Sequence, residues 1–205
     1  MAVLGATAMT AQSSQHGRDR NPDPDARADA IVRAMTLDEK IHLLHGTLGF
    51  AYGGKPAPDG ARPGAGFIAA LPRLGIPALQ LNDGPLGVRN IADGPDGRAT
   101  AMPSAQALAA SFDPGLAFES GRIMGREARD RGYNVLLAGG ANVERDAWNG
   151  RNFEYLGEDP LLAGRMVSAQ IRGIQSQGVV STVKHFVANS QETDRHRVDM
   201  TADER

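Results

Sequence analysis

Near its end, the 205-residue chain reads Val179-Val180-Ser181-Thr182-Val183-Lys184-His185-Phe186-Val187-Ala188-Asn189-Ser190-Gln191-Glu192-Thr193-Asp194-Arg195. The first five residues are small or β-branched and are typical of a buried strand, whereas most of the following residues are polar or ionisable. The strand is therefore expected to deliver Lys184 and His185 to a sheet edge. In a parallel α/β barrel that edge carries the active site, although a solvated loop after an ordinary strand explains these residues equally well.

The chain contains two earlier copies of the same arrangement, in which a glycine precedes a short apolar run that ends in polar residues: Gly75–Asp83 and Gly132–Asp146. Amphipathic helices are predicted between the copies. Each begins with an Asp-Pro pair and ends at a glycine. One runs from Asp113-Pro114 to Gly132, and the other runs from Asp159-Pro160 to Gly178.

This alternation of strand and helix predicts a parallel sheet with right-handed crossovers, either closed as a barrel or open and doubly wound. The chain has no strand-linked GxGxxG or GxxxxGK[ST] motif, which disfavours dinucleotide-binding and P-loop sheets. Because an eight-unit barrel needs about 250 residues, the predicted fold is α/β, a partial TIM-type (β/α) barrel formed by the first several βα units.

The composition excludes several classes of function. With a net charge of −2 and 41% hydrophobic residues, the chain is an ordinary globular one, and neither nucleic acid nor a membrane is expected as a partner. There is no cysteine, so disulfides and thiolate chemistry are excluded. No cofactor is expected.

The start of the chain is predicted to lie outside the barrel, whereas its end is predicted to be an interrupted part of it. Residues 1–24 are interpreted as a tail or linker, and residues 25–205 as the barrel part. Met1–Ser14 is similar to the end of a secretory signal, which favours a periplasmic or secreted protein over the cytoplasmic alternative. Thr36-Leu-Asp-Glu39 is a capping box that starts a helix. Met200–Arg205 has the composition of a helix start, so the polypeptide is expected to continue.

Two of the strand ends carry residues suited to binding a sugar. Asp83 is followed by Gly-Pro and forms a turn in one interpretation. In the other, its carboxylate accepts hydrogen bonds from adjacent hydroxyls while Arg89 orients it. Arg151 lies beside Phe153 and Tyr155, where a guanidinium binds sugar hydroxyls and the rings either stack on the sugar or simply pack.

Three motifs in order carry a family resemblance: Asn-Asp-Gly-Pro-x-Gly-x-Arg, Gly-Arg-Asn-Phe-Glu-Tyr-x-Gly-Glu-Asp-Pro and Lys-His-Phe-x-x-Asn-x-x-Glu-x-x-Arg. From about Asp25 to Arg205 the chain resembles the N-terminal barrel domain of the glycoside hydrolase family 3 β-glucosidases. This resemblance implies a retaining, exo-acting β-glucosidase that removes terminal non-reducing β-D-glucosyl residues from oligosaccharides or β-glucosides. The residues implied to line its sugar-binding subsite are Asp83, Arg89, Arg151, Lys184, His185 and Arg195.

The resemblance also implies that no catalytic residue lies in this chain. The nucleophilic Asp is expected downstream of Arg205 and the acid/base further on, so the missing C-terminal remainder of the same polypeptide is an expected partner and residues 1–205 alone are expected to be inactive. The carboxylates Glu154, Glu158, Glu192 and Asp194 match positions that act as scaffold in the family.

Other interpretations remain open. They are another β-glycosidase of the family, such as a xylosidase or glucan exohydrolase, a non-catalytic glycan-binding module, and an unrelated phosphate-binding barrel enzyme. The β-N-acetylhexosaminidase branch is disfavoured because Val187-Ala-Asn-Ser-Gln191 departs from its Pro-Gly-His-Gly-Asp segment. A metal site at Asp194, His196 and Asp199 has no helical spacing to support it.

Overall fold

The computed structural model of the protein describes residues 23–89, 98–185 and 188–201. It divides into two compact units, Met1–Met35 and Thr36–Arg205. The predicted signal remnant and most of the predicted tail lie outside the described residues, as do the last four residues of the expected C-terminal helix start. None of the helices in the described ranges is both long and apolar enough to cross a bilayer.

In its described residues, the first unit contains the helix α1 (Pro24–Ala34). It begins at an Asp-Pro pair, where Asp23 Oδ1 accepts a hydrogen bond from the backbone N–H of Asp25 at 3.3 Å and Pro24 needs no hydrogen-bond partner in the first turn.

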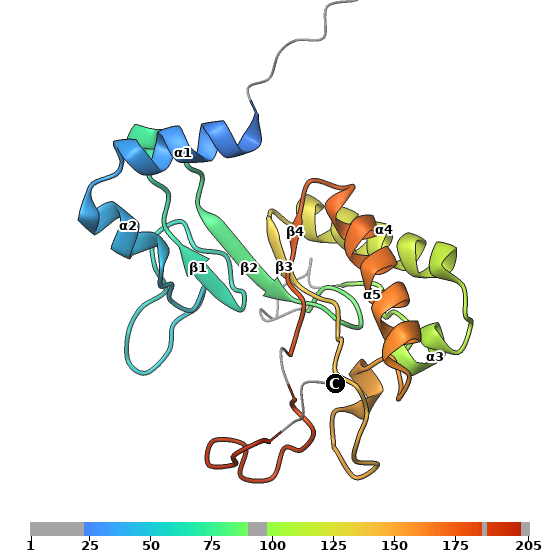
Figure 1. The fold of residues 1–205 in the computed structure, drawn as a ribbon. Coiled ribbons are helices and arrows are strands. Elements are labelled where there is room, and N and C mark those ends of the chain that lie inside the picture. The colour runs from blue at the N-terminus through green and yellow to red at the C-terminus, as the bar shows by residue number, and fades with distance from the viewer. Residues whose placement is uncertain (1–22, 90–97, 186–187, 202–205) are drawn as a thin grey trace, which may run out of the picture. The chain divides into compact units, whose positions relative to one another are not determined.

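The second unit alternates strands and helices (Figure 1). Its elements are α2 (Leu37–Leu43), β1 (Gly66–Ile68), η1 (Pro72–Leu74), β2 (Leu79–Asp83), α3 (Ala105–Ala109), α4 (Pro114–Asp130), β3 (Val135–Leu137), η2 (Asn152–Glu154), α5 (Pro160–Gln175) and β4 (Val180–Ser181). In the described residues the sheet order is β1-β2-β3-β4. Strands β2, β3 and β4 are parallel, with Asp83 opposite Leu137 and Leu136 opposite Ser181, which confirms the predicted βα alternation.

Strand β1 adds an antiparallel edge to this parallel sheet, and the sequence did not indicate it. Phe67 pairs with Gln80, and the two strands are joined by residues 69–78 only. A parallel crossover needs about a dozen residues or more. The short connection therefore returns the chain antiparallel, and the sheet departs from the all-parallel pattern at this edge.

The predicted capping signals are confirmed at three helices. Thr36 and Glu39 form the reciprocal capping box of α2. Asp113 Oδ1 accepts from the N–H of Gly115 at 2.7 Å at the start of α4, and Asp159 Oδ1 accepts from the N–H of Leu161 at 2.8 Å at the start of α5. Local signals therefore determine where the helices that follow β2 and β3 begin.

Helices α4 and α5 pack with their backbones in close contact. A Cβ atom at Gly121 of α4 would lie 2.0 Å from the carbonyl oxygen of Gln170, and one at Gly173 of α5 would lie 2.1 Å from that of Phe118. Only glycine permits this approach. It brings Met124 and Ile174, both fully buried, onto Leu136 of β3 in one core cluster.

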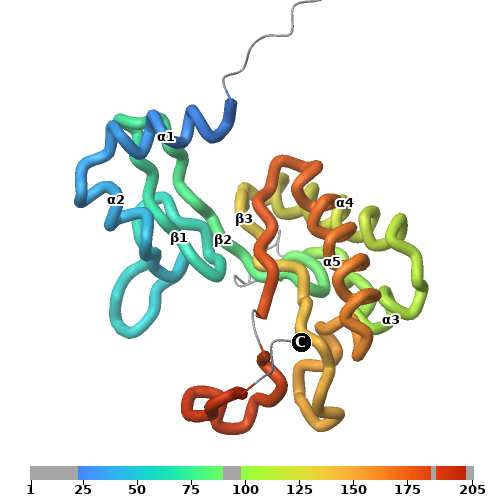
Figure 2. The backbone as a smooth tube through the Cα atoms, viewed as in Figure 1, coloured from blue at the N-terminus to red at the C-terminus, as the bar shows by residue number. Residues whose placement is uncertain are grey.

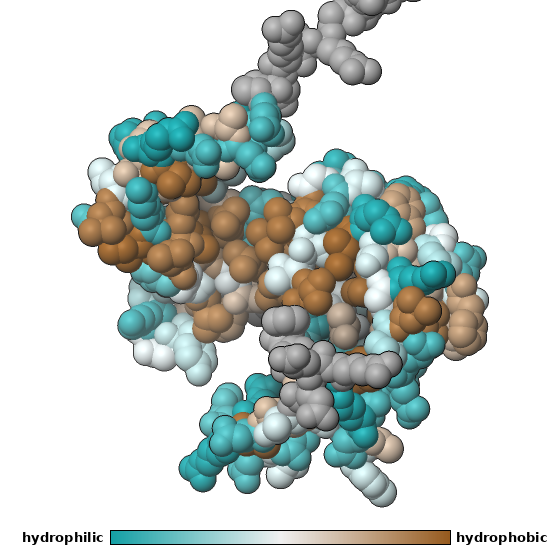
Figure 3. Space-filling model, in the orientation of Figure 1, coloured by the Kyte–Doolittle hydropathy of each residue, from teal (hydrophilic) through white to brown (hydrophobic). Residues whose placement is uncertain are grey.

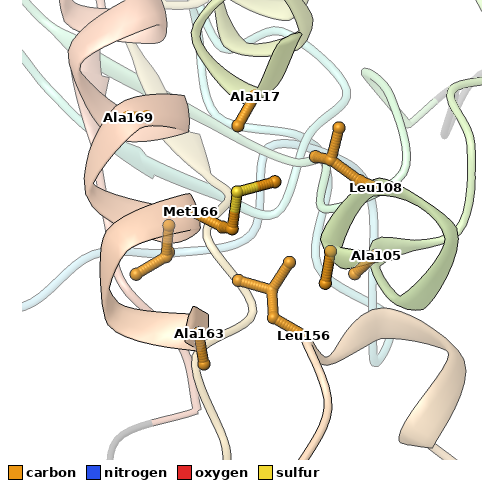
Figure 4. Packing of buried hydrophobic residues seen from close by; sticks show 9 residues of the cluster. Ala105, Leu108, Ala117, Leu156, Ala163, Met166 and Ala169 are labelled. Atoms are coloured by element: carbon orange, nitrogen blue, oxygen red, sulfur yellow. The ribbon is translucent and has the colours of Figure 1, made fainter. Parts of the chain in front are cut away.

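A second cluster closes the amino-terminal ends of the helices. Met166 of α5 lies among Leu108 of α3, Ala117 of α4 and Leu156 (Figure 4). The sequence interpretation did not include α3, whose first turn is capped by Ser104. Through Leu156, this packing holds the loop between β3 and α5 against the helical layer.

Strand β4 leaves apolar side chains uncovered. Val180 of β4 is 57% exposed and Val183, two residues after the strand, is 41% exposed, and apolar side chains are visible over the strands in Figure 3. In a closed barrel every strand has neighbours on both sides and its side chains are covered. The exposed strand therefore fits the predicted partial barrel.

Candidate active site

The carboxyl ends of β2, β3 and β4 meet at one edge of the sheet. Beyond β4, the backbone N–H of Lys184 donates to the carbonyl of Gly139 at 3.0 Å, and Ala141 donates to the carbonyl of Lys184 at 2.8 Å. The parallel ladder thus continues past β3 and places Lys184 beside Asp83, the last residue of β2. The loop after β3 and the segment after β4 run together from this edge (Figure 2).

A cleft of about 860 Å³ opens at this edge. All six residues predicted to form a sugar subsite line it: Asp83, Arg89, Arg151, Lys184, His185 and Arg195. The sequence predicted that these residues act together, and the structure brings them together.

Asp83 is paired with two cations. Lys184 Nζ donates to Oδ1 at 2.9 Å, and Arg89 Nη1 lies 3.7 Å from Oδ2. The Asp83 side chain is 26% exposed and that of Lys184 is 15% exposed. Among the described residues, the carboxylate bonds to no main-chain group of the following turn. The turn interpretation therefore does not account for this side chain, and its charge is held at the cleft.

Arg151 is oriented by a buried carboxylate. The turn η2 places Glu154, whose side chain is 5% exposed, so that it accepts a hydrogen bond from Arg151 Nε. Burial opposes the charge on Arg151, but the hydrogen bond and charge of Glu154 outweigh it and raise the Arg151 pKa. The guanidinium therefore stays charged and fixed at the cleft wall.

Glu192 holds the second arginine of this wall. Its Oε2 accepts from Arg195 Nη1 at 2.9 Å, and its Oε1 lies 3.8 Å from Arg151 Nη1. Burial raises the pKa of Glu192, but a hydrogen bond from Asn189 and the charges of the two arginines lower it overall. Glu192 is therefore an anion that positions both guanidinium groups, which agrees with the scaffold role expected for it.

His185 is held at its backbone and at its ring. Its N–H donates to Oδ1 of the buried Asn142 at 2.7 Å, and its Nδ1 lies 3.2 Å from the hydroxyl of Tyr155. Burial, and then the positive charges of Arg151 and Lys184, lower the pKa of His185 below its usual value. The imidazole is therefore neutral near pH 7.

The two aromatic residues near Arg151 have different environments. Phe153 lines the cleft and is 50% exposed, whereas Tyr155 is fully buried. Phe153 therefore presents a ring on which a sugar can stack, while Tyr155 reaches the site only through its hydroxyl.

Sequence reasoning missed several contributors to the cleft. Asn142 anchors His185, and its place in the polar cluster after the second predicted strand was an available signal. Thr100 reaches the cleft because its N–H donates to Glu127 of α4 at 3.1 Å. No local pattern marked Thr100, because its position depends on a helix far along the chain. Within the described ranges, no group of three or more His, Cys, Asp or Glu side chains is arranged to hold a metal ion.

A sheet of parallel strands with a charged, polar cleft at their carboxyl ends is typical of α/β proteins that bind a ligand at the strand ends, barrel enzymes among them. The model of the Glycosyl hydrolase family 3 N terminal domain matches residues 64–205, and the chain belongs to this family. The match begins just before β1. It covers every motif that carried the resemblance, but not the helices α1 and α2 within the predicted range 25–205.

Curated relatives and solved structures agree with this assignment. The chain is 39% identical to a beta-glucosidase from Rhizobium radiobacter over 180 residues, which are 86% of this chain and 20% of the relative. It is 41% identical to thermostable beta-glucosidase B from Acetivibrio thermocellus, covering 85% of this chain and 22% of the relative. The chain therefore spans about a fifth of the length of these relatives.

The fold matches solved family members at similar identity. Beta-glucosidase 3B from Thermotoga neapolitana, solved in complex with glucose, superimposes with a TM-score of 0.74 at 41% identity, covering 82% of this chain and 24% of that one. A beta-glucosidase from Streptomyces venezuelae, solved in complex with D-glucose, gives a TM-score of 0.72 at 42% identity, covering 82% of this chain and 20% of that one. The predicted partial barrel is confirmed.

Proposed function

We propose that this chain forms the sugar-binding side of the catalytic barrel of a retaining, exo-acting β-glucosidase. The substrates are terminal, non-reducing β-D-glucosyl residues of oligosaccharides or glucosides. The observation that carries the proposal is the charged carboxylate of Asp83, held by Lys184 and Arg89 in a cleft with further donors on its walls.

The chemistry of the cleft suits a hydroxyl-rich ligand. An ionised carboxylate has about four acceptor positions, and Lys184 and Arg89 do not use all of those on Asp83. Adjacent sugar hydroxyls donate to the remaining positions, while Lys184, Arg151 and Arg195 donate to sugar oxygens. The half-exposed ring of Phe153 supplies an apolar face at the same cleft. Family members solved with glucose support a sugar as the ligand.

We further propose that the nucleophile and the acid/base come from elsewhere in the polypeptide. Retaining hydrolysis needs two carboxyl groups about 5–5.5 Å apart, one to attack and one to donate a proton. Among the described residues that line the cleft, the carboxylates are Asp83 and Glu154, and each is already paired with a cation. Neither is free to attack an anomeric carbon, so this side of the cleft binds and orients.

The test uses the product of the complete reading frame. Hydrolysis of 4-nitrophenyl β-D-glucoside with the β-anomer of glucose as first product, seen by proton NMR, is the expected result, and Asp83→Ala should abolish it. Asp59→Ala is the matched control, because Asp59 is exposed and does not line the cleft.

Each other outcome points to a different interpretation. Preference for the xyloside would indicate that the protein is another β-glycosidase of the family. Sugar binding without turnover would indicate that it is a glycan-binding module. Unchanged turnover in Asp83→Ala refutes the proposed subsite.

A further inference from the structure

His185 lines the cleft, and which of its two ring nitrogens carries the proton decides whether Nε2 can donate or accept a hydrogen bond there. Nδ1 lies 3.2 Å from the hydroxyl of Tyr155, and the rings of the two residues meet edge to face, with centroids 6.1 Å apart. Within the described residues, no hydrogen bond reaches Nε2. A neutral imidazole has one donor and one acceptor nitrogen, so the direction of the Tyr155 bond determines whether Nε2 donates or accepts.

That direction is determined by a chain of contacts that begins at Glu192. Its carboxylate is ionised, as its lowered pKa indicates, and therefore accepts only. Asn189 faces it at 3.0 Å, so the atom turned toward Glu192 must be the amide nitrogen, Nδ2. The same Nδ2 lies 3.1 Å from the Tyr155 hydroxyl and donates to its oxygen.

With Asn189 donating to it, the Tyr155 hydroxyl has its own proton left to give. Among the described residues, the acceptor within hydrogen-bond distance of this hydroxyl is His185 Nδ1, at 3.2 Å. If Nδ1 instead carried a proton, both neighbours would donate to one oxygen, and the hydroxyl proton would have no acceptor among the described residues. Tyr155 is fully buried, and an unpaired donor in such a place is unfavourable.

We propose that Glu192, Asn189 and Tyr155 are positioning residues that hold His185 as the Nε2–H tautomer, so that Nε2 donates a hydrogen bond to a sugar oxygen in the cleft. The sugar part of this proposal rests on the proposed function, whereas the tautomer does not. The charged groups around the ring are the preceding residue Lys184, Arg151 and Glu154 of the loop after β3, and Glu192. Burial and the two cations keep the ring neutral, so a single proton has to be placed.

The first experiment reads the tautomer directly in the product of the complete reading frame. Imidazole nitrogens are observed by NMR after selective ¹⁵N-histidine labelling, and the His185 signals are assigned by their loss in His185→Gln. We expect a proton on Nε2 and none on Nδ1 at pH 7.5 in the wild type, and a mixture of tautomers in Tyr155→Phe. A proton on Nδ1 in the wild type overturns the proposal, whatever the enzyme hydrolyses.

The second experiment couples the tyrosine hydroxyl to the substrate. Hydrolysis of 4-nitrophenyl β-D-glucoside is compared with that of its monodeoxy analogues. Removal of the sugar hydroxyl that His185 contacts should lower the kcat/KM of the wild type about tenfold more than it lowers the kcat/KM of Tyr155→Phe, because a neutral hydrogen bond is worth about that factor. Asn189→Leu, which frees the hydroxyl to turn, should give an intermediate value.

Tyr133→Phe is the matched control. It removes a hydroxyl that donates to the carbonyl of Pro63 at 2.6 Å, away from the cleft. Its deoxy-sugar pattern should equal that of the wild type. If all analogues show the same losses in Tyr155→Phe as in the wild type, or if Tyr133→Phe changes the pattern equally, the positioning role is refuted while the β-glucosidase assignment stands. If no glucoside is hydrolysed, the proposed function fails and the ¹⁵N spectrum alone decides the tautomer.

Discussion

Replacing Asp83 by Asn keeps the shape of the side chain and removes its charge. Lys184 loses an ionic partner at 2.9 Å, and the sugar loses an acceptor for one or two hydroxyls. Hydrogen bonds to charged groups contribute about 1.5–3 kcal/mol each. We therefore expect a loss of about 3 kcal/mol in transition-state stabilisation, which corresponds to a roughly hundredfold fall in kcat/KM. Part of this loss should appear in kcat, because binding energy away from the reacting centre helps to reach the transition state.

Stability should fall much less than activity. The side chains of the pair are 26% and 15% exposed, and the amide oxygen introduced by Asp83→Asn can still accept a hydrogen bond from the Lys184 ammonium, so Lys184 is not left without a partner. The expected loss in the free energy of unfolding is about 1 kcal/mol. Steady-state kinetics and urea melts on the product of the complete reading frame measure the two quantities, with Asp59→Asn as the control.

A second background separates two roles of the carboxylate. If Asp83 serves only to neutralise Lys184, then Asp83→Asn should cost nothing in a Lys184→Met variant. If Asp83 also binds sugar hydroxyls, Asp83→Asn should still lower kcat/KM by at least tenfold in the Lys184→Met background, since one charge-assisted bond of about 1.5 kcal/mol remains to be lost. A kcat/KM for the single variant near that of the wild type would refute the reasoning altogether.

Three further results are expected. Gly173→Ala should lower the free energy of unfolding by about 1–3 kcal/mol because its Cβ meets the Phe118 carbonyl at 2.1 Å, whereas Gly164→Ala in the same helix, with open space around it, should raise it by up to about 1 kcal/mol in urea melts. Since burial and the charges of Arg151 and Lys184 lower the pKa of His185, the folded state binds fewer protons than the unfolded chain between this lowered pKa and the unfolded value of about pH 6.5. Stability should therefore fall as the pH drops below that value, with a shallower slope in His185→Gln. Residues 1–205 expressed alone should hydrolyse no aryl β-glucoside, and turnover that disappears in Asp83→Ala would contradict this.

The parts of the fold that the sequence predicted are those determined by adjacent residues. Asp113-Pro114 and Asp159-Pro160 cap their helices with their own side chains, and Gly132 and Gly178 adopt the positive φ angles that follow a helix end. Such signals act over a few residues, so they do not depend on how the rest of the chain folds. The order of strands and helices, and the parallel pairing of β2, β3 and β4, follow from them.

The parts that the sequence did not predict depend on distant partners. Strand β1 has three residues, too few for an alternating pattern, and it exists because Phe67 pairs with both Gln80 and Thr47. Helix α3 has a Ser cap and good helix formers, which were an available signal. Its burial, however, is decided by Met166 and Leu156 from elsewhere in the chain.

The same distinction explains the cleft. Parallel strands end at one edge, so residues that follow those ends in the sequence, such as Asp83 and Lys184, had to converge. No comparable rule predicts from the sequence in which direction each side chain of a loop points. Around the turn η2, Arg151, Phe153 and Glu154 line the cleft while Tyr155 is buried behind it, and only this division places the Tyr155 hydroxyl against His185. The Arg-Asn-Phe-Glu-Tyr motif therefore predicts which residues belong to the site. Which of them face the sugar, and which hold the others in place, is determined only by the three-dimensional structure.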